Sequence, residues 1–237
     1  MNSNANHIKQ NERNKHEQNR SKLIRDYCAE RHITKLCHFT RIENLKSILH
    51  LGLLGRTLLQ EVSKIQQTQQ SIFNDDYRLD GHTEAVCLSI SFPNYKMFYK
   101  LNHSNPKEWV VLLIEPYLLW EFDCAFYGEN AASNAVKHIS LSERKSFSSF
   151  AQMFMDYNNH KRQDIGISSN CPTHPQAEVL ILEPISPKYI MEVHFNDKEV
   201  TQKWLTENKG KFTQKFTYGS QYFMPREDWA AWKSNNN

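Results

Sequence analysis

Short apolar runs, most of them ended by proline or asparagine, constrain the fold of this chain more than any other feature. Runs of this length, rich in β-branched and aromatic residues, are typical of strands. Apolar residues at helical spacing predict helices between them at 92–101, 146–157 and 198–208. Because strands and helices do not alternate strictly, the pattern predicts an α+β domain with a mixed sheet. The predicted strands are TKLCHF (34–39), AVCLSISF (85–92), WVVLLIEP (109–116), AEVLILEP (177–184), YIMEVHF (189–195) and QYFMP (221–225).

The domain organisation follows from length and local composition. A chain of 237 residues is long enough for one large domain, which we expect over residues 21–237. Residues 1–20 are rich in Asn, Gln, Lys and Arg and lack apolar periodicity, so we expect them to be disordered. The alternative is a polar helix that continues into SKLIRDYCAERHI (21–33).

Several classes of protein are excluded by what the sequence lacks. There are only 7 glycines, with no G-x-G-x-x-G and no P-loop motif, so a nucleotide would have to bind without a glycine-rich cradle. Five scattered cysteines show no metal-ligand spacing, and we expect no metal site. With no apolar segment at the N-terminus and no membrane-length apolar run, we expect a cytoplasmic protein. The net charge of +3 permits an anionic partner without indicating one.

The stretch LCHFTRIENLKSIL (36–49) places an ionisable side chain, His38, at the end of a short strand. Leu36 and His38 should share one face of that strand. Thr40 and Glu43 have capping-box spacing, so we expect Thr40 to begin a helix that ends at Gly52. A histidine at such a junction is most often structural. At a strand end it can also bind a ribose hydroxyl or an amide.

Glu178 is a carboxylate within, or entering, an otherwise apolar strand. Carboxylates are rarely buried without a partner or a task, although an edge-strand glutamate facing solvent would show the same pattern. Gln176 would share the face of Glu178 if both lie in the strand, and its amide has the donor and acceptor needed to contact a base edge. A solvent-facing glutamine is the alternative. Glu183, before a proline, is more easily interpreted as a surface charge.

An aromatic stripe at helical spacing, Phe147, Phe150, Phe154 and Tyr157, is most often part of a core. One member at the rim could still stack on an unpaired base, and Phe150 is our candidate for nucleic-acid binding.

Four blocks resemble, in order, the DarT family of DNA ADP-ribosyltransferase toxins. They are HFTRIENLKSILHLGLL (38–54), RLDGHTEAVCLSISFPNYKMFY (78–99), QAEVLILEP (176–184) and FMPREDWAAW (223–232). The resemblance implies a compact ADP-ribosyltransferase-like fold with a split sheet, which uses NAD to modify a base of single-stranded DNA. Family members modify thymine or guanine. The segment after the first helix departs from the thymine enzymes, which favours guanine slightly. An RNA or protein acceptor, or a non-enzymatic nucleic-acid-binding module, is the alternative.

The resemblance also implies roles for particular residues. Cleavage of the nicotinamide–ribose bond develops positive charge on the ribose, which a carboxylate stabilises most in the transition state. Glu178 is the candidate for that role, and Arg78 is the candidate functional arginine, with Arg56 as its rival and a paired surface arginine as the alternative. The candidate NAD-binding residues are His38, Phe39, Thr40, Asn44 and Ser47. The expected partner is an antitoxin that removes ADP-ribose, a hydrolase of macrodomain or NADAR type, in a bacterial system of phage defence.

Overall fold

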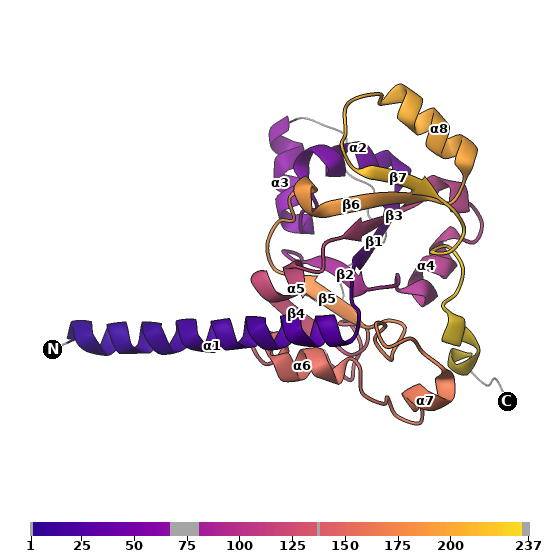
Figure 1. The fold of residues 1–237 in the computed structure, drawn as a ribbon. Coiled ribbons are helices and arrows are strands. Elements are labelled where there is room, and N and C mark those ends of the chain that lie inside the picture. The colour runs from indigo at the N-terminus through magenta and orange to yellow at the C-terminus, as the bar shows by residue number, and fades with distance from the viewer. Residues whose placement is uncertain (1, 67–80, 137, 234–237) are drawn as a thin grey trace.

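The computed structural model describes residues 2–66, 81–136 and 138–233. Helices cover a central sheet of seven strands, and the first helix extends away from the body (Figure 1). The helices are α1 (Asn2–Glu30), α2 (Ile42–Leu51), α3 (Arg56–Gln66), α4 (Tyr95–Asn102), α5 (Leu118–Glu121), α6 (Phe147–Gln152), α7 (Arg162–Ile165) and α8 (Lys198–Glu207), with 3-10 turns η1 (Pro106–Glu108), η2 (Glu143–Lys145), η3 (Pro187–Tyr189) and η4 (Glu227–Trp232). The strands are β1 (Leu36–Arg41), β2 (Val86–Ile90), β3 (Trp109–Ile114), β4 (Cys124–Tyr127), β5 (Glu178–Ile181), β6 (Ile190–Phe195) and β7 (Lys215–Tyr218).

The sheet has the order β4-β5-β2-β1-β3-β6-β7. Each neighbouring pair is antiparallel except β6 and β7, which are parallel. Every residue of β3 is buried, as expected for a strand with a layer of side chains on each face. The predicted α+β class with a mixed sheet is confirmed.

Five of the six predicted strand segments contain strands, and the sixth is wrong. In the segment 221–225, Tyr222 and Phe223 lie in a turn, and both are buried against Trp109 and Val111. Their apolar character therefore reflects packing rather than strand pairing. The last strand is β7, whose half-exposed pattern is typical of a sheet edge. Strand β4 was not predicted, because a strand of four residues between two loops has too little periodicity to detect.

Two faces of the sheet carry separate hydrophobic clusters. On β1, Leu36 belongs to the main cluster, while Cys37 and Phe39 pack on the other face with Phe98 and Trp109. The predicted alternation of side chains along this strand is therefore confirmed at those positions.

Residues 2–20 are helical, so the expectation of disorder is wrong and the alternative, one continuous polar helix, is the observed arrangement. Gln, Glu, Lys and Arg have good helix propensity, and no glycine or proline interrupts the run. The second half of α1 packs on the body, where Ile24 and Cys28 are buried and Ser21 Oγ donates to the carbonyl of Trp120 over 2.6 Å. Within the described ranges, no helix is both long enough and apolar enough to cross a membrane.

Candidate functional site

The sheet opens between its two central strands. β1 pairs with β3 at six positions, from Leu36 to Arg41, but with β2 only at Leu36 and Cys37. The remaining residues of β2, Val86 to Leu88, pair only with β5, on the side away from β1. The two strands therefore diverge after Cys37, and the sheet is split at this point. A split sheet is what the resemblance to the DarT family implied.

His38 is the first residue beyond the point of divergence. Its Nδ1 lies 3.0 Å from the carbonyl oxygen of Cys87 on β2, so the ring reaches across the opening. Burial lowers the pKa of this half-buried imidazole, which is therefore neutral near pH 7. Because a carbonyl only accepts, Nδ1 carries the ring proton and Nε2 is left as an acceptor. A neutral imidazole held in this way can accept a hydrogen bond from a hydroxyl or an amide.

The helix behind His38 begins one residue later than the predicted cap at Thr40 implies. Its N-cap is Arg41, without a side-chain capping bond, so the capping box of Thr40 and Glu43 is wrong. Thr40 is instead an extended residue of β1, paired with Val110, and its hydroxyl accepts from the side chain of Asn44 over 3.1 Å. Strand pairing has overridden the local capping pattern.

The two candidate NAD-binding residues of α2, Asn44 and Ser47, lie close together on its first turns. Asn44 is buried and Ser47 is half-buried, and Ser47 Oγ donates to the carbonyl of Asn44 over 2.8 Å. Phe39 precedes them on β1, stacked on Phe98 with ring centroids 4.5 Å apart. These side chains follow directly on the opening beside His38. The start of a helix also favours an anionic group, because its first backbone N–H groups lack partners within the helix.

Glu178 begins β5, two strands away from β1. It is half-buried, and its carboxylate accepts from the backbone N–H of Ala131 over 3.1 Å and from the Asn130 side chain over 3.4 Å. Leu88 pairs with Val179, and the same register continued by one residue aligns Glu178 with Ser89, the partner of Cys37. Since neighbouring strands lie ~4.8 Å apart, the backbones of Glu178 and Cys37 are about 10 Å apart.

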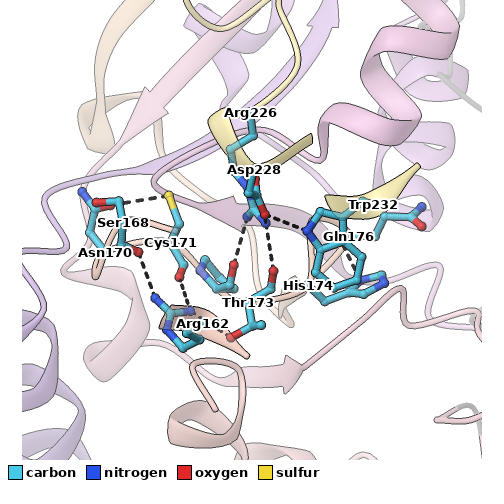
Figure 2. A network of polar contacts seen from close by, with 11 residues as sticks. Arg162, Ser168, Asn170, Cys171, Thr173, His174, Gln176, Arg226, Asp228 and Trp232 are labelled. Atoms are coloured by element: carbon cyan, nitrogen blue, oxygen red, sulfur yellow. Dashed lines mark hydrogen bonds and ion pairs between the residues drawn. The ribbon is translucent and has the colours of Figure 1, made fainter. Parts of the chain in front are cut away.

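Gln176 does not lie in the strand. It belongs to a turn before β5, so the prediction that its side chain shares a strand face with Glu178 is wrong. Its backbone N–H donates to Nδ1 of His174 over 3.2 Å. Figure 2 shows the polar network that surrounds this turn.

Phe150 is part of the core, so the prediction that it binds nucleic acid is wrong. Its side chain has no exposed surface, and its ring packs against Tyr27 and Phe126 with centroids 5.8 and 4.9 Å apart. The helical spacing of the stripe was a core signal, the more common outcome for such a pattern.

The two candidate arginines have different outcomes. Arg78 lies in the segment 67–80, outside the described residues, and its role stays a prediction. Its rival Arg56 is the half-buried first residue of α3. Among the described residues, no group of three or more His, Cys, Asp or Glu side chains is arranged to hold a metal ion.

Sequence reasoning missed the residues that surround the turn before Glu178. Arg226 and Asp228 form a buried ion pair next to it, and Arg162 donates to the carbonyl of Cys171. The adjacent opposite charges of PREDW (225–229) were a signal for such a pair, but a local sequence does not reveal what a buried arginine contacts.

His174 supplies a test by pH. Burial lowers its pKa from 6.5 to about 4, with Lys96 and Arg226 adding to the effect and Glu129 opposing it. Since the folded ring binds a proton less readily than the unfolded one, its stabilising contribution is complete above pH 6.5 and is lost as the pH falls towards 4. Between pH 7 and pH 5 this ring should cost about 2 kcal/mol of unfolding free energy.

Urea denaturation of the protein and of His174→Gln at both pH values measures this contribution. The carboxylates titrate in both proteins, so their effect on the unfolding free energy cancels when the two are compared. The pH-dependent loss should shrink in His174→Gln and be unchanged in His138→Gln, a change at an exposed position. Equal pH dependence in all three proteins would contradict the assignment.

The sequence around this opening matches one known protein family. A family model described as "ssDNA thymidine ADP-ribosyltransferase, DarT" matches residues 37–220, which is more than half of the chain. The chain belongs to the DarT family. The DarT match begins at the second residue of β1, includes the opening beside His38 and strand β5 with Glu178, and stops before η4. No curated protein sequence matches the chain.

Solved DarT structures resemble this member of the family in fold. The structure of "Thermosipho africanus DarTG in complex with ADP-ribose" has a TM-score of 0.55 and 18% identity over 81% of this chain. The present chain spans about half the length of that one, 52%. Structures of Thermus sp. 2.9 DarT in complex with NAD+ and with ADP-ribosylated ssDNA have TM-scores of 0.48, at 13% and 14% identity. They cover 83% and 84% of this chain and 96% of their own. The expected ADP-ribosyltransferase-like fold is confirmed.

Proposed function

We propose that this DarT-family protein transfers ADP-ribose from NAD to a thymine base of single-stranded DNA and releases nicotinamide. The observation that carries the proposal is the placement of Glu178 and His38 on either side of the split in the sheet, within a chain that belongs to this family. Where Glu178 aligns with Cys37, the two strands are about 10 Å apart, which leaves room for one bound nucleotide at the opening.

NAD would lie along the opening between β1 and β2. His38, neutral and with Nε2 as an acceptor, would accept a hydrogen bond from a ribose hydroxyl or from the nicotinamide amide. The backbone of Phe39 and Thr40, with Asn44 and Ser47, would line the same opening. The N-terminus of α2 would stabilise the pyrophosphate.

Glu178 would stabilise the transition state of the cleavage. As the C–N bond to nicotinamide breaks, its electron pair leaves with the ring and the ribose gains oxocarbenium character. A carboxylate held by the Ala131 N–H would bind the 2-hydroxyl of that ribose more strongly as the charge develops. A base nitrogen then forms a bond to the ribose carbon and loses its proton. Arg78 would polarise the base.

Thymine is the proposed acceptor because the family description names thymidine. Nothing in that description supports the preference for guanine that the sequence suggested. Gln176, in the turn before Glu178, would contact the edge of the base with its side-chain amide.

The test is mass spectrometry of nucleosides from single-stranded DNA and RNA oligomers that each lack one base, after incubation with the protein and NAD. We expect adducts on every DNA oligomer that contains thymine and none on the oligomer without it. Loss of adducts only from the oligomer that lacks guanine would assign the other base. Labelling of RNA alone, or of protein alone, would contradict the DNA acceptor.

We further propose a neutralising partner that removes ADP-ribose from DNA, since the first of the similar structures is named DarTG rather than DarT. Copurification with each of the two expected hydrolase types, macrodomain and NADAR, followed by a de-modification assay, would distinguish them. The cytoplasm is the proposed place of action because both proposed substrates, NAD and DNA, are found there. Residues 21–237 would form the transferase domain.

A further inference from the structure

Two arginines, the buried Arg226 and the half-buried Arg162, hold the turn that precedes Glu178 (Figure 2). Three successive carbonyl oxygens of the turn each accept from a guanidinium. Arg162 donates to Cys171 O over 2.9 Å, and Arg226 donates to Pro172 O and Thr173 O, both over 2.9 Å. Because charge-assisted hydrogen bonds to three successive carbonyls restrict several backbone dihedrals at once, these contacts stabilise one conformation of the turn.

Arg226 is itself fixed by its own segment of the chain. Its Nε and Nη2 donate to the two oxygens of the Asp228 carboxylate over 2.6 and 2.7 Å. That carboxylate has no exposed surface and also accepts from Trp232 Nε1 over 2.7 Å. A fully buried pair with this fork geometry holds its parts rigidly, because either partner alone would be an uncompensated buried charge.

Trp232 connects the Arg226–Asp228 pair to the ring of His174, which lies next to Gln176. It stacks on His160 with centroids 4.0 Å apart and meets the ring of His174 edge-on at 4.9 Å. His174 Nδ1 accepts from the Gln176 backbone N–H. The segment from Arg226 to Trp232, which we name the C-terminal clasp, therefore holds both the turn and the residue that positions Gln176.

Glu178 is anchored by different elements. It pairs with Tyr127 on β4, and its carboxylate accepts from Ala131 and Asn130, none of which belongs to the clasp. Two residues that are close in sequence thus have different direct contacts, Glu178 with β4 and the residues after it, and Gln176 with the ring that the clasp holds.

We propose that the C-terminal clasp is a positioning device that directs the ribosyl group to DNA rather than to water, with Arg226 as its key positioning residue. This rests on the proposed function and extends it to a segment beyond the family match, which ends at residue 220. Once nicotinamide has left with its electron pair, the ribose carbon bonds either to a base nitrogen or to a water oxygen, and a proton is lost in each case. Glu178 assists the cleavage that precedes both reactions, transfer to DNA and hydrolysis by water. Only transfer to DNA needs the base in place beside Gln176.

The test compares two products of one reaction, nicotinamide and ADP-ribosylated oligonucleotide, in the full chain and in Arg226→Lys. Lysine keeps the charge but not the fork, so the turn should loosen while β5 is unchanged. We expect the fraction of cleaved NAD that reaches DNA to fall at least about fivefold, with nicotinamide release within about threefold of the original. Hydrogen exchange should accelerate at residues 171–177 and not in β5.

The matched control is Arg20→Lys. This half-buried guanidinium donates to the carbonyl of Lys145 over 2.5 Å, outside the turn, and the substitution should leave the partition unchanged. Trp232→Phe removes the indole N–H but keeps an aromatic ring, and it should lower the fraction of cleaved NAD that reaches DNA about twofold. This variant replaces Arg226→Lys in the test if Arg226→Lys does not fold.

An unchanged partition in a folded Arg226→Lys, or an equal loss of both products, would overturn the proposal. The same holds for an unchanged partition in Trp232→Phe if that variant is the one measured. If the original protein releases no nicotinamide and labels no oligomer, the proposed function fails and takes this inference with it.

Discussion

Glu178→Gln should lower ADP-ribosylation of single-stranded DNA by about 10²–10³-fold while the protein stays folded. Glutamine keeps nearly the same shape and an oxygen that can accept from the Ala131 N–H. It lacks the negative charge that stabilises the oxocarbenium-like ribose, so the loss should appear in the rate of bond cleavage rather than in NAD affinity. The measurement is the initial rate of adduct formation with labelled NAD at saturating oligonucleotide.

Glu183→Gln is the matched control for this prediction. Glu183 is exposed, follows the same strand, and accepts from the backbone N–H of Asp123 over 2.9 Å. Activity of Glu183→Gln should stay within about twofold of the original. Retention of near-original activity in a folded Glu178→Gln would remove this carboxylate from the mechanism.

Gly52→Ala should lower the unfolding free energy by at least about 3 kcal/mol. Gly52 ends α2 with φ +92° and ψ −176°, a region that is essentially restricted to glycine. An added Cβ would lie 2.2 Å from the carbonyl oxygen of Ile185, which accepts from the Leu53 N–H. Neither backbone can move without breaking the pair of hydrogen bonds between Leu53 and Ile185. The loss corresponds to a melting temperature lower by roughly 6–12 °C.

Gly210→Ala separates the effect of the positive φ from the effect of the close contact with Ile185. Gly210 also has a positive φ, +71°, but nothing lies within 4 Å of an added Cβ. This control should cost about 1 kcal/mol, the conformational part alone. Equal losses in the two variants, measured by thermal denaturation, would show that the close approach to Ile185 has no effect.

Much of the sheet could be predicted from the sequence because strands such as β3 are uniform apolar runs with clear stops. The failures have a common cause. Tyr222 and Phe223 have strand-like side chains, yet they are apolar because they pack beneath the sheet. The Thr40 capping pattern was equally local, and pairing with β3 overrode it. Local patterns report burial and propensity, but they do not report which segment supplies the neighbour.

The candidate site divides in the same way. Glu178 and His38 were identifiable because each is an ionisable group where an apolar run begins or ends. Gln176 was selected for a strand geometry that it does not have. Phe150 was selected for a spacing that serves both cores and surfaces, and its burial became visible only in the packed fold.

Residue types and short-range order were enough to predict the class of fold and the family, and to select Glu178 and His38 as candidates, whose roles stay predictions. The packed fold was needed to show that the sheet opens beside His38, that residues 2–20 belong to a helix, and that Arg226 donates to the carbonyls of Pro172 and Thr173. The physical reason is distance along the chain. Contacts between residues far apart in sequence depend on how every intervening element packs, and no local pattern contains that information.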